Sequence, residues 1–148
     1  MKEDLIAPCG MNCNLCSAYR FRENDLNKQG FHKSYCLGCI PRGKNCTHLN
    51  NWCELLGKGK IRFCFECDKY PCKRLKALDK RYREKYHMSM IDNLNYIREN
   101  GIERFLIKEE IKWRCPKCGG TICCHNGLCL NCSFHTLLQN KKYRWNEE

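Results

Sequence analysis

Cysteine limits the folds open to this chain more than any other residue does. It occupies 16 of the 148 positions, whereas valine is absent and alanine occurs only as Ala7, Ala18 and Ala77. The length suffices for one domain, or for one domain and a small module, with a buried core. Because valine and alanine are so scarce, we expect the cysteines to supplement apolar burial in holding the fold.

The chemistry of these cysteines depends on their compartment. The first residues, M-K-E-D-L-I-A-P, contain no apolar run of signal-peptide length, and no stretch approaches the ~20 apolar residues of a membrane span. We therefore expect a soluble, cytoplasmic protein with no membrane association. Disulfides are rare in the cytosol, so cysteines spaced as C-x-x-C are interpreted as metal ligands, with a disulfide scaffold as the alternative.

The formal charge of +11 suggests an acidic partner such as nucleic acid. Each zinc ion bound by four thiolates subtracts two charges, however, so three such sites bring the charge to about +5. This modest excess is compatible with RNA binding, and solubility alone explains it equally well.

The cysteine-free segment 73–114 predicts three helices. The first follows Pro71, the second begins at the capping residue Ser89 and ends at Asn100-Gly101, and the third runs over 102–113. Apolar residues at helical spacing are predicted to face inward in each. They are Leu75, Leu78 and Tyr82; Ile91, Leu94 and Ile97; and Ile102, Phe105 and Leu106.

The clearest motif is C-terminal: W-R-C-P-K-C-G-G, followed by C-L-N-C-S. Two C-x-x-C turns supply the four soft ligands that tetrahedral zinc binds at about 2.3 Å. A rubredoxin-like iron site is the nearest alternative, but the second turn lacks the Pro and Gly usual there. We predict a zinc ribbon over 114–135. Its ligands are Cys115, Cys118, Cys129 and Cys132.

Three further residues lie between these two turns. Cys123 and Cys124 can replace a ligand or form a reactive pair, but we interpret them as spare thiols beside a complete site. His125 is expected at the surface.

The N-terminal half carries ten more candidate ligands, enough for two four-cysteine zinc sites with two thiols left over. One grouping closes Cys36, Cys39, Cys46 and Cys53 around one ion, and the two flanking triads share the other. Such pairing cannot be read from sequence, and His32 or His48 can substitute for a thiolate. The triads are Cys9, Cys13 and Cys16, and Cys64, Cys67 and Cys72.

The first triad, in P-C-G-M-N-C-N-L-C, has the C-x-x-x-C-x-x-C spacing with which radical enzymes hold an iron–sulfur cluster. Such enzymes place the triad in a β/α barrel, which needs repeated strand–helix units over roughly 200 residues or more. This chain has none, so the sequence argues against a radical enzyme. A simple iron–sulfur protein stays an alternative, because these three thiolates and a fourth can hold a cubane cluster.

Three motifs in order, P-C-G-M-N-C-N-L-C-S-A-Y, C-L-G-C and F-C-F-E-C-D-K-Y-P-C-K-R-L, resemble a cysteine-rich prokaryotic family known as domain of unknown function 3795. The resemblance covers about residues 5–113, and the ribbon resembles a C-terminal extension of some members. It implies a small metal-binding protein with no established activity. Cys46 and Cys53 match it less firmly than the other N-terminal cysteines.

Together these features predict a small metal-stabilised α+β protein. Its parts are a cysteine-rich domain over 1–113, with metal-binding loops 9–72 and helices 73–113, the ribbon 114–135 and a basic tail 136–148. We expect a zinc-binding module, with about three ions, that acts as an adaptor for a protein partner. No acid–base or nucleophile–base arrangement indicates an enzyme.

Two alternatives stay open. Nucleic acid can bind through the ribbon and a tail that alternates basic and aromatic residues. An iron–sulfur or thiol redox protein can use unligated thiols among Cys46, Cys53, Cys123 and Cys124. The tail residues are Lys141, Lys142, Tyr143, Arg144 and Trp145.

Overall fold

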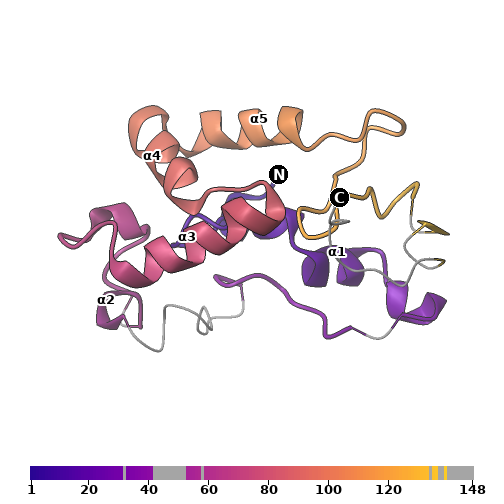
Figure 1. Cartoon of the computed structure of the whole chain (residues 1–148), viewed down its shortest axis with the longest axis horizontal. Helices are drawn as coiled ribbons and strands as arrows, with labels where there is room; N and C mark the ends of the chain where they lie inside the picture. Colours follow the sequence, from indigo (N-terminus) through magenta and orange to yellow (C-terminus); the bar gives the residue numbers. More distant parts are fainter. Residues whose placement is uncertain (32, 42–52, 58, 134, 137–138, 140–148) are drawn as a thin grey trace.

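The protein is described from a computed structural model that covers all residues except 32, 42–52, 58, 134, 137–138 and 140–148. In the described part the chain is mostly helical (Figure 1). The helices are α1 (Ser17–Glu23), α2 (Glu54–Gly57), α3 (Lys73–Tyr86), α4 (Met90–Asn100) and α5 (Ile102–Lys112), with short 3₁₀ turns η1 (Glu3–Leu5), η2 (Cys13–Leu15), η3 (Leu26–Gln29) and η4 (Cys64–Glu66).

Extended structure among these residues is limited to three isolated antiparallel bridges. They pair Ile6 with Asn12, Arg114 with Thr121, and Ile122 with Cys129. The helical component of the predicted α+β fold is therefore present. Its β component amounts to single bridges rather than a sheet in the described part of the chain.

The three helices expected between the cysteine groups are α3, α4 and α5. At the start of α4, Ser89 Oγ accepts a hydrogen bond from the backbone N–H of Asp92 at 3.0 Å. Gly101 separates α4 from α5 with φ of +87°, a conformation that favours glycine. These two residues divide the segment as predicted.

Asp79, in the middle of α3, ties this helix to the start of α4. Its buried carboxylate accepts hydrogen bonds from Ser89 Oγ at 2.6 Å and the backbone N–H of Ile91 at 3.0 Å, and pairs with Arg83 Nε at 2.7 Å. A buried charge is stable only when paired and hydrogen-bonded, and Asp79 meets both conditions.

The main core lies where α3, α4 and α5 meet the N-terminal loop. Leu75, Leu94 and Phe105 are fully buried, and each belongs to the inward-facing set predicted for its helix. Gly10 lies so close to α4 that a Cβ atom there would come within 2.5 Å of the carbonyl oxygen of Met90. The loop that carries the first cysteines is therefore packed directly on a helix.

Glu109 is an unexpected member of this interior. Its side chain on α5 is buried, and Oε1 accepts a hydrogen bond of 3.5 Å from Asn12 Nδ2. Burial raises the pKa of this carboxyl group above its usual range.

A second small core joins the C-terminal segment to the N-terminal part. Cys123 and Leu130 pack there with Phe21, Leu26 and Phe31. The two phenylalanine rings meet edge to face at 5.3 Å. The segment between the two C-terminal cysteine turns thus rests on α1 and η3.

Candidate metal centre

Four cysteines converge at the C-terminal end of the described chain. Their Sγ atoms all lie within 4.8 Å of one another, with Cys115 and Cys132 separated by 3.6 Å and Cys118 and Cys129 by 3.5 Å. Tetrahedral zinc with sulfur at about 2.3 Å sets sulfur atoms roughly 3.8 Å apart. The cluster therefore has nearly the dimensions of a metal site.

The backbone of the first turn is shaped around these sulfur atoms. The N–H of Cys115 donates to the carbonyl of Gly120 at 2.7 Å, and the N–H of Gly120 donates to Cys118 Sγ at 3.3 Å. A Cβ atom on Gly120 would lie 3.2 Å from the sulfurs of both Cys118 and Cys129. A side chain at this position would crowd both thiols, which would have to shift by a few tenths of an ångström.

The electrostatics of the cluster favour a thiolate at one ligand. Backbone N–H groups of Cys118 and Lys117 point at the sulfur of Cys115 and lower its pKa to about 7. Burial has the opposite effect on Cys129, whose pKa it raises to about 12. A cation held by these four residues would supply the charge that lets all of them lose their protons together.

No disulfide bond occurs among the described cysteines. In the part of the chain that the structure describes, the C-terminal cluster is the one place where three or more metal-ligating side chains approach within 4.8 Å.

Cys123, Cys124 and His125 do not join this cluster. The N–H of Cys124 donates to the carbonyl of Leu15 at 2.9 Å, and both cysteines are fully buried. Burial raises the pKa of Cys123 to about 12 and that of Cys124 well above its usual value. A thiol must ionise to act as a nucleophile, so these two are poorly suited to redox chemistry.

The expectation that His125 lies at the surface is wrong. The ring is half-buried, its Nδ1 accepts from the N–H of Ser17 at 3.1 Å, and its Nε2 lies 3.2 Å from the hydroxyl of Tyr82. Since Nδ1 is an acceptor, Nε2 carries the proton and donates to Tyr82. His125 thereby links the C-terminal segment to α1 and α3.

The N-terminal cysteines are arranged differently from the predicted grouping. Cys16 interacts electrostatically with Cys13 and Cys36, and a Cβ on Gly38, in the C-L-G-C turn, would lie 3.7 Å from Cys13 Cβ. The turn from Cys36 to Cys39 therefore lies beside the first triad. Burial is the main cause that raises the pKa of Cys16.

Cys53 lies with the second triad instead. Together with Cys64, Cys67 and Cys72 it lines a small apolar cavity of about 30 Å³. Cys9, in the first triad, is buried in the main core. The predicted ligand Cys46, the candidate substitutes His32 and His48, and the tail residues Lys141 to Trp145 lie outside the described residues.

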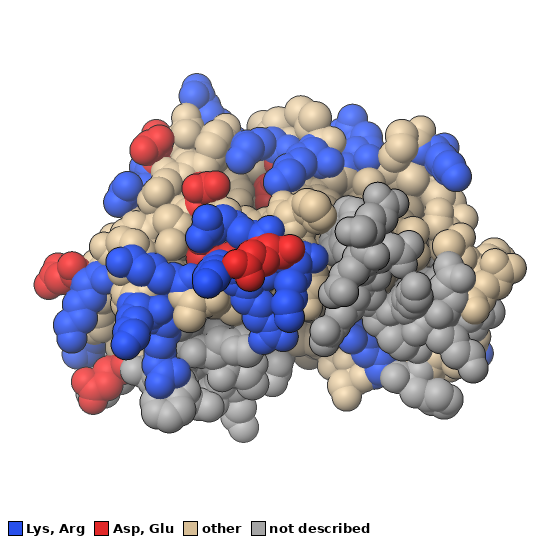
Figure 2. Space-filling model, in the orientation of Figure 1, with Lys and Arg blue, Asp and Glu red and all other residues tan. Residues whose placement is uncertain are grey.

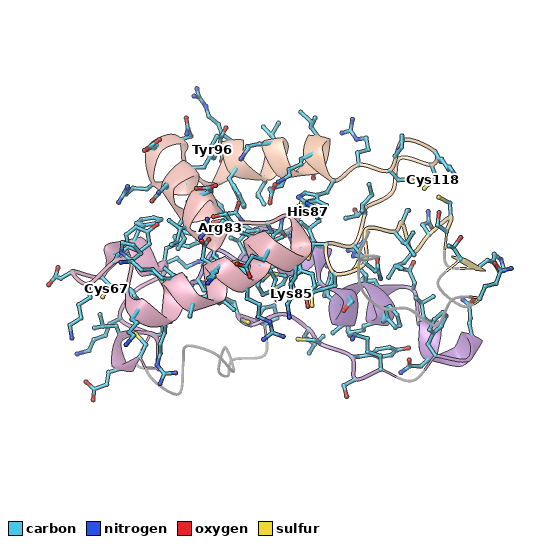
Figure 3. All side chains as sticks on the ribbon, viewed as in Figure 1. Cys67, Arg83, Lys85, His87, Tyr96 and Cys118 are labelled. Carbon is cyan, nitrogen blue, oxygen red and sulfur yellow. The ribbon has the colours of Figure 1, made fainter. Side chains whose placement is uncertain are left out.

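Figure 3 places Cys67 and Cys118 at opposite ends of the longest axis of the molecule. The cavity near α2 and the C-terminal cluster are consequently separate places. None of the helices described is long and apolar enough to cross a membrane.

The helices and the cysteine cluster define a small, mostly helical, cysteine-rich protein with a candidate metal centre. Residues 5–77 match the model of a family described as a protein of unknown function (DUF3795), which confirms the predicted resemblance over this part of the chain. This match ends inside α3, short of the predicted limit near Trp113, and does not include the C-terminal cluster. No curated protein and no solved structure matches the chain.

Proposed function

We propose that this is a cytoplasmic zinc protein in which bound ions stabilise a binding, or adaptor, module. The observation that carries the proposal is the approach of four thiols to within 4.8 Å of one another at Cys115, Cys118, Cys129 and Cys132. Structural zinc sites have four protein ligands, whereas catalytic ones keep a position open for water or substrate. Four cysteines close the coordination shell, so the ion has a structural role and the protein surface does the binding.

We also propose that residues 114–135 form a zinc ribbon. The bridges from Arg114 to Thr121 and from Ile122 to Cys129 support it, because they bring the two cysteine turns together across a hairpin. With the ten N-terminal cysteines as further ligands, about three zinc ions are expected in the whole chain. The part over 1–113 is proposed as the other unit, held to the ribbon through His125.

Elemental analysis of the purified protein, combined with its absorption spectrum, tests this proposal. We expect about three zinc ions per chain and no visible absorption, because zinc is d¹⁰ and has no redox or ligand-field colour. A brown or red protein with stoichiometric iron would show that the ligands hold iron–sulfur clusters or rubredoxin-like iron instead.

A second candidate function, binding of RNA, is favoured by the surface of α3. Exposed basic residues cover this helix, whose acidic residues are the buried Asp79 and the exposed Glu84. Lys and Arg side chains gather over it in Figure 2. A row of cations along a 14-residue helix, about 21 Å long, fits a polyanion. The basic residues are Lys73, Arg74, Lys76, Lys80, Arg81, Arg83 and Lys85.

Neutralising two of these charges tests the candidate. Lys76→Gln/Lys80→Gln should weaken single-stranded RNA binding and reduce its salt dependence, because two fewer counterions are released. Arg104→Gln/Lys108→Gln is the matched control, since it removes an exposed pair at the same spacing on α5. Equal effects of the two double variants would show that net charge, rather than α3, governs the association.

A further inference from the structure

We propose that Cys53, Cys64, Cys67 and Cys72 together bind one metal ion, separate from the ion at the C-terminal cluster. This proposal rests on the metal-binding role proposed above and names the ligands of one of its N-terminal sites. In this proposal Cys53 does not share an ion with Cys36, Cys39 and Cys46, which is the grouping that the sequence spacing suggested.

The geometry that points to this site is a shared cavity. Four of the eight residues that line it are these cysteines, and the others are Leu56, Ile61, Tyr70 and Leu75. Leu75 is a fully buried residue of the main core. The four thiols therefore share a small space with apolar side chains, in which Cys64 is buried and Cys53, Cys67 and Cys72 are partly exposed.

The local backbone holds the second triad in place around this space. Cys64 and Cys67 flank the η4 turn, in which the N–H of Cys67 donates to the carbonyl of Cys64 at 3.1 Å. Glu66 Oε2 accepts from the N–H of Phe63 at 2.6 Å. These hydrogen bonds fix the turn, and the side chains of Cys64 and Cys67 both line the cavity.

The two remaining ligands, Cys72 and Cys53, are positioned by neighbouring helices. Cys72 is the residue before the first turn of α3, and a helix N-terminus stabilises negative charge such as that of a bound thiolate. Tyr70, between Cys67 and Cys72, donates its hydroxyl proton to Asn95 Oδ1 at 2.7 Å and so anchors this loop to α4. Cys53 completes the set from the start of α2.

The number and chemistry of the ligands point to a single ion. Four thiols and four mainly apolar side chains line a small cavity of about 30 Å³. Four thiolates suit a soft or borderline divalent metal such as zinc. No three of these sulfur atoms lie within 4.8 Å of one another, so ion binding draws the four together.

The number of metal ions bound by double variants tests the grouping. Replacing two ligands of the same ion should cost one ion, whereas replacing ligands of two different ions should cost two. Each protein is equilibrated with a chelator that competes for incompletely coordinated zinc and is then analysed for bound zinc. We expect Cys67→Ser to lose one equivalent and Cys53→Ser/Cys67→Ser to lose the same one. Cys67→Ser/Cys118→Ser, the matched control across the two ends of the molecule, should lose two.

A third double variant separates this grouping from the one that the sequence suggested. Cys36→Ser/Cys53→Ser should lose two equivalents if the two residues bind different ions, and one if they share an ion. A loss of two equivalents in Cys53→Ser/Cys67→Ser, or of one in Cys36→Ser/Cys53→Ser, would overturn the proposal.

A measurement on the unmodified chain avoids variants that fail to fold. In protein loaded with cadmium-113, proton–cadmium correlations join each ion to the β-protons of its own cysteine ligands. One ion correlated with Cys53, Cys64, Cys67 and Cys72 supports the proposal. Stoichiometric metal with other ligand sets would refute this grouping alone, whereas a chain that binds no metal would also refute the proposed function.

Discussion

The helical segment α3–α5 and the cysteine-rich segments on either side of it achieve stability by different means. In the helices, apolar residues such as Leu75, Leu94 and Phe105 are fully buried, and side chains such as Ser89 cap the ends. In the flanking segments, cysteines such as Cys9, Cys13 and Cys64 are buried in the core beside apolar residues. We therefore expect the flanks to depend on what their thiols bind more strongly than the helices do.

The largest expected effect is the loss of the flanks when metal is removed. Structural zinc contributes about 10–16 kcal/mol per site in zinc-finger peptides, more than the total stability of most domains. We expect a strong chelator to melt the cysteine-rich segments and lower the thermal midpoint sharply, while part of the α3–α5 helical signal persists. Circular dichroism with a parallel metal assay measures both. An unchanged spectrum and midpoint after complete metal removal would contradict the structural role of the ions.

The reverse experiment destabilises the helices and leaves the metal sites alone. Asp79→Ala removes an acceptor of three hydrogen bonds and leaves Ser89 and Ile91 without their buried partner. We expect a loss of roughly 2–3 kcal/mol in unfolding free energy with no change in bound zinc. Denaturant unfolding at fixed zinc concentration measures the loss, and Glu84→Ala, an exposed acidic residue on the same helix, is the control. Zinc loss in Asp79→Ala alone would show that the two regions are coupled.

The contrast between the helices and the cysteine-rich segments also explains which features could be predicted from the sequence. Helix positions follow from local signals, so Ser89, Gly101 and the buried stripe of each helix were predictable. The C-terminal cluster was predictable for a similar reason, because its four ligands lie on two short turns. Asp79 and Glu109 were missed, since a charged residue on an amphipathic helix is expected to face solvent.

The arrangement of the remaining cysteines depends on long-range packing, which no spacing encodes. Cys53 lies beside the second triad because α2 packs near the start of α3, and His125 is half-buried because it meets Ser17 and Tyr82. The sequence around these residues does not predict either contact. Spacing along the sequence therefore identifies candidate ligands, but it does not show which of them lie together in the fold.

Two neighbouring glycines in the C-terminal cysteine turn, Gly119 and Gly120, allow the effect of crowding the thiols to be compared with that of backbone strain. Gly120→Ala would place a methyl group 3.2 Å from two sulfur atoms, so we expect zinc affinity at this cluster to fall by about tenfold. Gly119→Ala meets no neighbour but has φ of +75°, so it should cost about 1 kcal/mol through backbone strain. Competition titrations with a chromophoric chelator measure the affinities. Equal affinities of Gly120→Ala and wild type would show that the turn relaxes around the added methyl.

The smallest expected effect concerns Glu109, a charge inside the helical region. Burial raises its pKa in the folded state, so the ionised form is disfavoured by folding, and the protein loses stability as the pH rises from the unfolded-state pKa through the raised value. Glu109→Gln removes this penalty and retains an oxygen that accepts the hydrogen bond from Asn12. The variant should therefore be more stable than wild type near pH 7, and the advantage should shrink as the pH falls towards 5. Thermal midpoints of both chains at matched zinc concentration, compared at each pH, measure this difference, with Glu103→Gln, an exposed residue on the same helix, as the control. A variant less stable than wild type at neutral pH would mean that the carboxylate is better satisfied in the folded chain than its burial implies.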